Sequence, residues 1–363
     1  MMTDAEYMRL ALELAGRGRY TTDPNPKVGC VIVKGDAVVG QGWHERAGQP
    51  HAEILALAEA GRRAHGATCY VTLEPCCHHG QTPPCTQALI DAGVREVVFA
   101  LEDPNPLVAG QGSAALAGAG IAVRHGPLAA ESRALNRGFV SRMSRGRPFV
   151  RAKLAVSLDG KTALASGISQ WITGPAARAD VHRQRAAASA ILTGSGTVIA
   201  DNPRLNARLD EAPEAVLQPR VVIVDSQLKV GGDAEVFKHG SPLLFTRVED
   251  RSALNAIERA GGEVEVQAGS GPVDLPDLMI RLAELGYNDV WVEAGADLSG
   301  ALAAAGLVDE YIIYYAPVLL GSTARGMFDF HVQEMSERIE LEVIEHTRLG
   351  DDLKIRARPR VIA

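Results

Sequence analysis

The chain has 363 residues, of which 46% are hydrophobic, so it exceeds the usual size of one domain and has enough apolar side chains for two cores. Its 44 acidic residues outnumber its 37 Lys and Arg residues, and the formal net charge of −7 argues against nonspecific binding to nucleic acid. Five cysteines are too few for a disulfide scaffold and favour a reducing, cytoplasmic environment. We find no export signal and no run of eighteen apolar residues, so we do not expect a membrane protein.

The first part of the chain alternates apolar runs of strand length with helical patterns, which is typical of an α/β domain. The expected strands are Val28–Val33, Val38–Val39, Ala67–Leu73, Val94–Leu101 and Ile121–Arg124. Two segments rich in Ala and Leu predict helices at His51–Ala60 and Thr86–Ala92. We expect these helices to cover the faces of a sheet.

A short basic segment, Ser141–Pro148, has little apolar content and neither helical nor strand periodicity, so it predicts a linker. A second series of strands is expected after it, at Phe149–Val156, Ala190–Leu192, Arg220–Val224, Leu243–Thr246, Glu263–Val266, Val290–Glu293 and Tyr311–Val318. Near the end of the sequence, Leu341–Thr347 and Leu353–Ala357 flank Gly350 in the pattern of a hairpin. The sequence therefore predicts two α/β domains, over residues 1–145 and 146–363.

Three potential metal ligands stand beside these elements. His51 opens a helix, Cys76 follows a strand and Cys85 precedes a helix. One imidazole and two thiolates suit Zn²⁺, and three protein ligands leave the fourth position of a catalytic zinc ion open to water. Glu53, two residues after His51, is close enough to shuttle protons without being a ligand. His-x-Glu followed by Pro-Cys is the signature of zinc deaminases, although eight residues instead of two separate the two cysteines here.

Two other interpretations of this cluster remain open. One is a helix-capping His beside two ordinary buried thiols. The other is a structural zinc ion whose fourth ligand is Cys77, His78 or His79. Both are weaker, because the two motifs occur in the helix and strand contexts expected of a deaminase and because a structural zinc site needs no nearby Glu. The other two cysteines, Cys30 and Cys69, lie in strand patterns and are expected in the core.

Glycine-containing loops in the chain suggest a nucleotide site without identifying one. Asp159–Thr162 lacks the earlier glycine of a phosphate-binding loop, and Gly110–Gly112 follows no strand. Thr193–Thr197 lacks the third small residue of the dinucleotide fingerprint. Thr193–Thr197 and Glu293–Asp297 nevertheless join a strand to a helix, where phosphate groups commonly bind. Loop glycines without any ligand are an equally good interpretation.

The metal motifs, together with Pro24–Val33 upstream, resemble the family of bifunctional riboflavin-biosynthesis deaminase–reductases. The long spacing between the cysteines and the Thr-Pro-Pro sequence before Cys85 are specific to that family. The resemblance continues through the second half at Lys153–Thr162, Ser169–Thr173, Leu192–Thr197, Asp201–Leu205, Arg208, Val292–Gly295 and Ala316–Gly321. It therefore covers nearly the whole chain.

The resemblance implies a cytidine-deaminase-like three-layer αβα domain followed by a dihydrofolate-reductase-like α/β domain. In the first, His51, Cys76 and Cys85 would bind Zn²⁺ and Glu53 would move protons. Its reaction would be hydrolytic removal of the 2-amino group of 2,5-diamino-6-ribosylamino-4(3H)-pyrimidinone 5′-phosphate, which gives 5-amino-6-(5-phosphoribosylamino)uracil. The second would use NADPH to reduce the ribosyl group of that product to ribityl.

The resemblance also implies which reductase residues face each ligand. NADPH would contact Ala155, Trp171, Thr197, Asp201, Ser226 and the loop from Gly295. The substrate would contact Ser169, Arg185, Leu205, Arg208 and Glu293. Either Arg185 or Arg208 is suited to hold the ribose phosphate, and Lys153 to lie near the sugar. Asp201 and Glu293 remain alternative groups for proton transfer.

In the first domain, Asn25 and His44 are candidates for contact with the pyrimidine ring, although an Asn in a Pro-Asn-Pro turn is equally well explained as structural. The expected partners are small phosphorylated pyrimidines, with no nucleic acid and no membrane, and homo-oligomerisation is left open. Two alternative functions are a nucleic-acid-editing zinc deaminase with an accessory domain and a non-catalytic, structural-zinc protein that senses a nucleotide.

Overall fold

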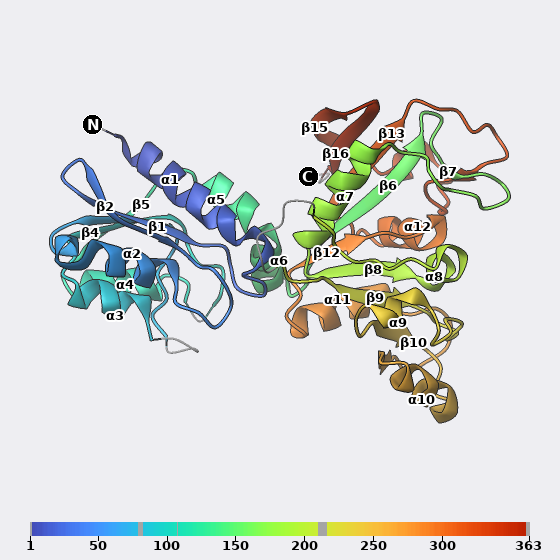
Figure 1. The fold of residues 1–363 in the computed structure, drawn as a ribbon, viewed down its shortest axis with the longest axis horizontal. Helices are drawn as coiled ribbons and strands as arrows, with labels where there is room; N and C mark the ends of the chain where they lie inside the picture. The colour runs from blue at the N-terminus through green and yellow to red at the C-terminus, as the bar shows by residue number, and fades with distance from the viewer. Residues whose placement is uncertain (1, 79–82, 107, 210–215, 361–363) are drawn as a thin grey trace. The chain divides into compact units, whose positions relative to one another are not determined.

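The computed structural model describes residues 2–78, 83–106, 108–209 and 216–360. They divide into two compact units, Met1–Arg147 and Pro148–Ala363, each with its own sheet and core (Figure 1). Within the described residues, no helix combines the length and the apolar character needed to cross a membrane.

The first unit is a sheet covered by helices on both faces (Figure 1). Its strands are β1 (Gly29–Lys34), β2 (Ala37–Trp43), β3 (Thr68–Leu73), β4 (Glu96–Leu101) and β5 (Ala122–His125). Its helices are α1 (Asp4–Arg17), α2 (Ala52–Ala60), α3 (Cys85–Asp91), α4 (Gln111–Gly118), α5 (Ala129–Leu135) and α6 (Arg137–Arg145). The strand order is β2-β1-β3-β4-β5, with β1 antiparallel to both neighbours and β3, β4 and β5 parallel. Helices α2, α3 and α4 pack on one face, and α1 packs on the other.

Helix α2 lies unusually close to the antiparallel edge of this sheet. A Cβ atom at Gly40 would lie 2.2 Å from the carbonyl oxygen of Ala56, and one at Gly42 would lie 2.6 Å from that of Ala52. Side chains on β2 at these positions would therefore push the helix away from the sheet. The glycines and the alanine-rich helix allow the approach, and this fixes the N-terminus of α2, where His51 and Glu53 stand.

The linker prediction for Ser141–Pro148 is wrong for most of that segment, because α6 runs to Arg145 and ends at Gly146 in the left-handed conformation. The helix buries Phe139 and Val140 against Leu73 and Leu101, and its arginines occupy the remaining surface. So narrow an apolar stripe is enough to dock a short helix, but it is too short to produce a clear periodic pattern in the sequence.

The second unit is built on a larger sheet (Figure 1). Its strands are β6 (Phe149–Ser157), β7 (Lys161–Ala163), β8 (Ala190–Gly194), β9 (Arg220–Val224), β10 (Leu243–Thr246), β11 (Glu263–Val266), β12 (Asp289–Val292), β13 (Glu310–Ala316), β14 (Arg325–Gly326), β15 (Leu341–Leu349) and β16 (Asp352–Pro359). Its helices are α7 (Pro175–Ala186), α8 (Ser195–Asp201), α9 (Glu235–Lys238), α10 (Arg251–Arg259), α11 (Leu275–Glu284) and α12 (Ala296–Ala304). The main sheet has the order β11-β10-β9-β8-β12-β6-β13-β16-β15. It is parallel from β11 to β13, whereas β16 and β15 are antiparallel.

The expected strands of this unit are confirmed, including the terminal hairpin, which turns at Gly350. The sequence did not indicate β7 and β14, a two-stranded ribbon outside the main sheet, because such short pairs carry no periodic pattern. Helices α11 and α12 cover one face of the main sheet, and α7, α8, α9 and α10 cover the other.

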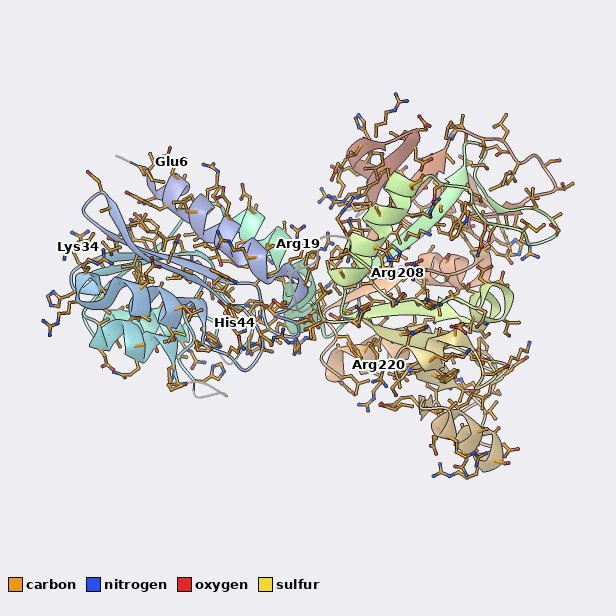
Figure 2. The ribbon with its side chains drawn as sticks, in the orientation of Figure 1. Glu6, Arg19, Lys34, His44, Arg208 and Arg220 are labelled. Carbon is orange, nitrogen blue, oxygen red and sulfur yellow. The ribbon has the colours of Figure 1, made fainter. Side chains whose placement is uncertain are left out.

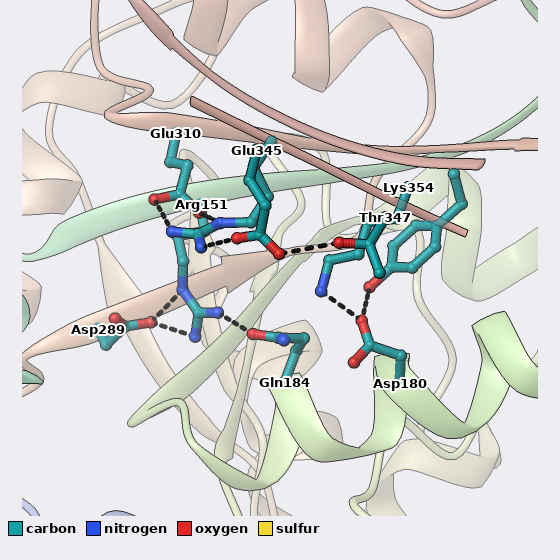
Figure 3. A network of polar contacts seen from close by, with 10 residues as sticks. Arg151, Asp180, Gln184, Asp289, Glu310, Glu345, Thr347 and Lys354 are labelled. Carbon is teal, nitrogen blue, oxygen red and sulfur yellow. Dashed lines mark hydrogen bonds and ion pairs between the residues drawn. The ribbon is translucent and has the colours of Figure 1, made fainter. Parts of the chain in front are cut away.

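A buried polar network fastens α7 to the sheet (Figure 3). The fully buried guanidinium of Arg151 donates to Asp289 Oδ1 at 2.6 and 2.8 Å and to Gln184 of α7 at 2.5 Å. One turn earlier on the helix, Asp180 accepts hydrogen bonds from Tyr314 and Lys354, both at 2.7 Å. Because buried charges are costly unless paired, these contacts fix the position of α7.

Candidate active sites

The first unit brings the three predicted metal ligands together. His51 is the residue before α2, Cys76 follows β3 and Cys85 begins α3, and their potential ligand atoms all lie within 4.8 Å of one another. The Nδ1 atom of His51 is 3.2 Å from Cys85 Sγ and 3.6 Å from Cys76 Sγ. The imidazole makes no capping hydrogen bond to α2, which removes the helix-cap interpretation. The donors are one imidazole and two thiols, a set that fits Zn²⁺.

The surroundings of this cluster favour a thiolate at Cys76. Its Sγ accepts a hydrogen bond from the backbone N–H of Cys85 at 3.4 Å. Hydrogen bonding by the Cys85 side chain, opposed by burial and reinforced by His51, holds the pKa of Cys76 well below its ordinary value. Among the residues that the structure describes, Cys77 and His78 do not join the group, and His79 lies outside them. An open fourth position is typical of a catalytic zinc ion.

Glu53 is buried on the first turn of α2, with 3% of its surface exposed. Burial and the nearby charge of Cys76 raise its pKa to about 7, although the charge of His51 acts in the opposite direction. A carboxyl group with a pKa near neutrality can both accept and donate a proton under working conditions. This is the property expected of the predicted proton shuttle.

Asn25 and His44 lie beside this cluster (Figure 2 labels His44). The ring of His44 stands edge-on to that of His51, with 5.2 Å between their centroids. Its Nδ1 is 3.2 Å from the carbonyl oxygen of Pro50 and its Nε2 is 3.1 Å from Asn25 Nδ2. Since the carbonyl can only accept, Nδ1 carries the proton and Nε2 accepts from the amide, which leaves the Asn25 oxygen available for a ligand. Burial lowers the pKa of His44, which favours the neutral ring.

Two buried carboxylates near the cluster, Glu74 and Asp103, were not identified as site residues from the sequence. Glu74 accepts hydrogen bonds from the backbone N–H groups of Asp103, Gly110 and Ser113 and from the Ser113 hydroxyl, at 2.9 to 3.3 Å. It thereby holds the loop after β4 and the start of α4 against the segment that carries Cys76. Burial, with the charge of Glu74, raises the pKa of Asp103 to about 6. The sequence did not show that Leu73 pairs with Leu101, which places the carboxyl ends of β3 and β4 side by side. Without that pairing, the proximity of Glu74 and Asp103 could not be predicted.

In the second unit, three of the predicted substrate residues form a charged cluster at the end of β12. Glu293 accepts hydrogen bonds from Arg185 of α7, Nε at 2.5 Å and Nη2 at 2.8 Å, and from the indole of Trp291 at 2.8 Å. The ammonium group of Lys153 is 3.9 Å from the same carboxylate. Burial alone would raise the pKa of Glu293, but the charge and hydrogen bonds of Arg185 lower it to about 2.

Arg208 extends this cluster towards solvent (Figure 2 labels Arg208). Its guanidinium donates to Asn206 Oδ1 at 2.9 Å and lies 3.0 Å from His182 Nε2, while Arg185 donates to the Asn206 carbonyl at 3.1 Å. Burial and the charges of Arg185 and Arg208 lower the pKa of His182 to about 4, so the ring is neutral. Arg185 is committed to Glu293, whereas Arg208 is exposed and has no carboxylate partner among the described residues. Arg208 is therefore the better placed of the two to receive a phosphate.

Four predicted cofactor residues lie along one edge of the main sheet. Thr197 and Asp201 are on α8, directly after β8, while Ser226 follows β9 and Gly295 follows β12. These strands are adjacent and parallel, so their carboxyl ends meet at one edge, the usual position of a nucleotide in an α/β sheet. Apart from the neighbours of Gly295 in the chain, no atom of the described residues lies within 4 Å of a Cβ built on it. Two buried atoms, Thr193 Oγ1 and Asp225 Oδ1, have no hydrogen-bond partner among the described residues. An open edge with spare polar atoms fits NADPH.

The remaining predicted residues are more dispersed. Ala155 is near the carboxyl end of β6, and Leu205 is buried on the segment after α8. Ser169 and Trp171 lie on the segment between β7 and α7, where Trp171 is 71% exposed and stacks on Arg178. Within the described residues, neither hydrogen-bonds to the pair formed by Arg185 and Glu293. The structure therefore does not bring these two residues into the charged cluster.

Each of the two units matches a known protein family. Residues 1–101 match the cytidine and deoxycytidylate deaminase zinc-binding region, and residues 148–355 match the RibD C-terminal domain. The first match includes His51, Glu53 and Cys76, and the second includes the charged cluster around Glu293.

Whole proteins resemble the chain over nearly its full length. The riboflavin biosynthesis protein RibD of Escherichia coli K12 is 48% identical, with 97% of this chain and 98% of that protein covered, and that of Haemophilus influenzae is 47% identical, with 98% of each covered. A solved structure of Acinetobacter baumannii RibD is 44% identical, covers 99% of both chains and has a TM-score of 0.93. A Thermotoga maritima structure described as a diaminohydroxyphosphoribosylaminopyrimidine deaminase/5-amino-6-(5-phosphoribosylamino)uracil reductase is 33% identical, covers 98% of this chain and 99% of its own, and has a TM-score of 0.88. The chain therefore belongs to the RibD family of riboflavin biosynthesis proteins.

Proposed function

We infer that the protein is a bifunctional enzyme of riboflavin biosynthesis, with a zinc-dependent deaminase in the first unit and an NADPH-dependent reductase in the second. The observation that carries this proposal is the pair of separate polar sites, each built at the carboxyl ends of parallel strands within its own unit. We propose residues 1–145 as the deaminase domain and 146–363 as the reductase domain.

The proposed first reaction removes the 2-amino group of 2,5-diamino-6-ribosylamino-4(3H)-pyrimidinone 5′-phosphate as ammonia. His51, Cys76 and Cys85 would hold the zinc ion, which supplies a Lewis acid that activates water. Glu53 would accept a proton from the attacking water and deliver it to the departing amine, because its pKa of about 7 suits both roles. Asn25 offers its amide oxygen to the pyrimidine ring and is oriented by its hydrogen bond to His44.

The proposed second reaction reduces the ribosyl group of the deaminated product to ribityl, with NADPH supplying the hydride. The exposed guanidinium of Arg208 binds the substrate phosphate. Glu293 fixes Arg185 through two hydrogen bonds, and Lys153 lies beside them near the sugar. The main contribution of the protein is to position the substrate against the cofactor, because the cofactor supplies the electrons. The deaminase needs reduced thiols at its zinc site and the reductase needs a reduced cofactor, which supports the cytoplasm as the place of action.

One assay tests the whole proposal. The purified, zinc-loaded protein is incubated with the diaminopyrimidinone phosphate and NADPH, while ammonia release and NADPH absorbance are followed together. We expect ammonia release first and NADPH oxidation after it. The proposal would be contradicted if the protein neither released ammonia nor oxidised NADPH. Deamination of tRNA or single-stranded DNA instead would point to the nucleic-acid-editing alternative.

A substitution at Glu53 tests whether the two sites are separable. Glu53→Ala should abolish ammonia release, yet leave NADPH oxidation intact when the deaminated pyrimidine is supplied directly. Glu59→Ala is the matched control, because Glu59 lies on the same helix but outside the site. Its carboxylate accepts a hydrogen bond from the backbone N–H of Gln41. Equal loss of both activities in Glu53→Ala would argue against two independent sites.

A further inference from the structure

The strand order of the second unit indicates the direction in which a bound dinucleotide extends. The reacting end must lie near Glu293, Arg185 and Lys153, at the ends of β12 and β6. The candidate cofactor residues then continue across the ends of β8 and β9 to Ser226. The next strand in the same direction is β10, which pairs with β9 in parallel. Groups at the carboxyl end of β10 therefore stand where the adenosine end of the cofactor would arrive.

Arg247 is the first residue after β10, and it is tied directly to Ser226. Its backbone N–H donates to the Ser226 carbonyl at 3.3 Å. Both side chains also bind the same loop, since Ser226 Oγ accepts from the backbone N–H of Val273 at 2.9 Å, and Arg247 Nε donates to the carbonyl of Pro272 at 3.0 Å. One hydroxyl and one guanidinium are thus anchored side by side at the ends of two neighbouring strands.

The guanidinium of Arg247 is oriented in advance and still has capacity for a ligand. Besides the bond from Nε to Pro272, Nη1 donates to the carbonyl of Ala268, so two backbone carbonyls fix the plane of the group. Nη2 has no hydrogen-bond partner among the residues that the structure describes. Immobilising an arginine before the ligand arrives reduces the entropy lost on binding.

Arg247 also borders a cavity of about 560 Å³ beside β10, β11 and α11, so a ligand can reach it. The carboxylates that line this cavity have other partners. Glu265 and Glu284 pair with Arg281, Asp277 accepts from Gln267, and Asp274 caps α11. Of the described residues lining the cavity, Arg247 is the cation without a carboxylate partner, and it is free to bind an anion.

We propose that Arg247, together with the Ser226 hydroxyl, binds the 2′-phosphate of NADPH and makes the reductase prefer NADPH to NADH. The inference rests on the proposed reductase function and adds to it the group that recognises the phosphorylated cofactor. Guanidinium groups bind phosphate through paired, charge-assisted hydrogen bonds, and an arginine near the adenosine ribose is the general means of accepting a 2′-phosphate.

Direct binding provides a test that does not depend on turnover. Isothermal titration of the full-length, zinc-loaded protein compares adenosine 2′,5′-bisphosphate with adenosine 5′-monophosphate, which differ only in the 2′-phosphate. The wild type should bind the bisphosphate more tightly. Arg247→Gln should weaken bisphosphate binding about 10- to 100-fold, the effect of losing a charged hydrogen bond, and leave monophosphate binding unchanged. Arg247→Lys keeps the charge and should recover part of the affinity.

Arg251→Gln is the control, because Arg251 is an exposed arginine on α10 that does not line the cavity. It should bind both nucleotides like the wild type. Ser226→Ala provides a second variant that leaves the arginine in place, and it should weaken the bisphosphate selectively. In steady-state assays, Arg247→Gln should raise the KM for NADPH and leave both kcat and the KM for NADH unchanged.

The outcomes separate this inference from the proposed function. A wild type that oxidises NADPH but binds the two nucleotides equally would overturn the role of Arg247 and leave the reductase intact. The same holds if Arg247→Gln weakens both nucleotides in equal measure, which would indicate a structural role. A wild type that oxidises neither NADPH nor NADH in the presence of the deaminated substrate would contradict the reductase function itself.

Discussion

The ion pair between Arg185 and Glu293 should contribute measurably to the stability of the second unit. Both side chains are nearly buried, with 13% and 11% of their surfaces exposed. The fall in the pKa of Glu293 from 4.5 to about 2 corresponds to about 3 kcal/mol of stability above pH 4.5. Glu293→Gln keeps the shape of the side chain but leaves Arg185 without its counter-charge, a change that typically costs about 3 to 5 kcal/mol.

The sign of the pH dependence follows from the direction of this shift. Because the pKa of Glu293 is lower in the folded protein, the stabilisation is complete above its ordinary pKa and is lost as the pH falls from 4.5 towards 2. About 2 kcal/mol should be lost between pH 7 and pH 3. The difference in unfolding free energy between the wild type and Glu293→Gln should therefore shrink by that amount over the same interval.

Urea unfolding monitored by tryptophan fluorescence can measure this difference. The three tryptophans are Trp43, Trp171 and Trp291, so a Trp43→Phe background restricts the signal to the second unit. Glu265→Gln is the control, because its pair with Arg281 is about one-third exposed and should contribute less than about 1 kcal/mol. A difference for Glu293→Gln below about 1 kcal/mol at pH 7, or one that is equal at pH 7 and pH 3, would refute this account of the pair.

Three further predictions concern the first unit. Gly112→Ala should destabilise the first unit in thermal melts, because the new Cβ would lie 2.1 Å from the Pro75 carbonyl oxygen. Gly118→Ala on the same helix is the control, because its Cβ would meet nothing within 4 Å, and it should be neutral or slightly stabilising. Glu74→Gln, which loses a buried anionic acceptor for several N–H groups, should lower the unfolding free energy by roughly 1 to 3 kcal/mol and weaken zinc retention in a chelator competition assay. Removing zinc with a chelator should stop ammonia release without changing NADPH oxidation with the deaminated substrate, and unchanged ammonia release would contradict a catalytic metal.

The sequence was most informative where chemistry is encoded in short segments. His51, Glu53 and Cys76 could be placed because each adjoins a strand or helix whose pattern is clear, and the structure brings the two ligands and Cys85 together. Glu74 lies within the same segment as Cys76 but was not recognised. Its role depends on Ser113, 39 residues further along the chain, and only the pairing of β3 with β4 makes that contact foreseeable.

Arg247 illustrates a different limit. It stands in no motif, and the resemblance to a known family did not identify it. Its side chain binds the carbonyls of Ala268 and Pro272, which lie in the loop after β11, and its backbone binds Ser226, which lies after β9. These loops meet only because β9, β10 and β11 pair in parallel. Patterns of hydrophobic residues predict that the strands exist, but they do not fix the strand order in the sheet. The neighbours of a loop residue follow from that order and therefore require the structure.

The structure argues against one of the two groups that the sequence left open for proton transfer in the reductase. Glu293 has a pKa of about 2, and its two oxygens accept hydrogen bonds from Arg185 and Trp291, so it carries no proton to donate near neutral pH. Its carboxylate is suited to orienting Arg185. Asp201 is exposed at the end of α8, and its negative charge opposes the lowering of the pKa of Lys153 by burial. We therefore assign Glu293 a positioning role through Arg185, and proton transfer by Asp201 remains a prediction.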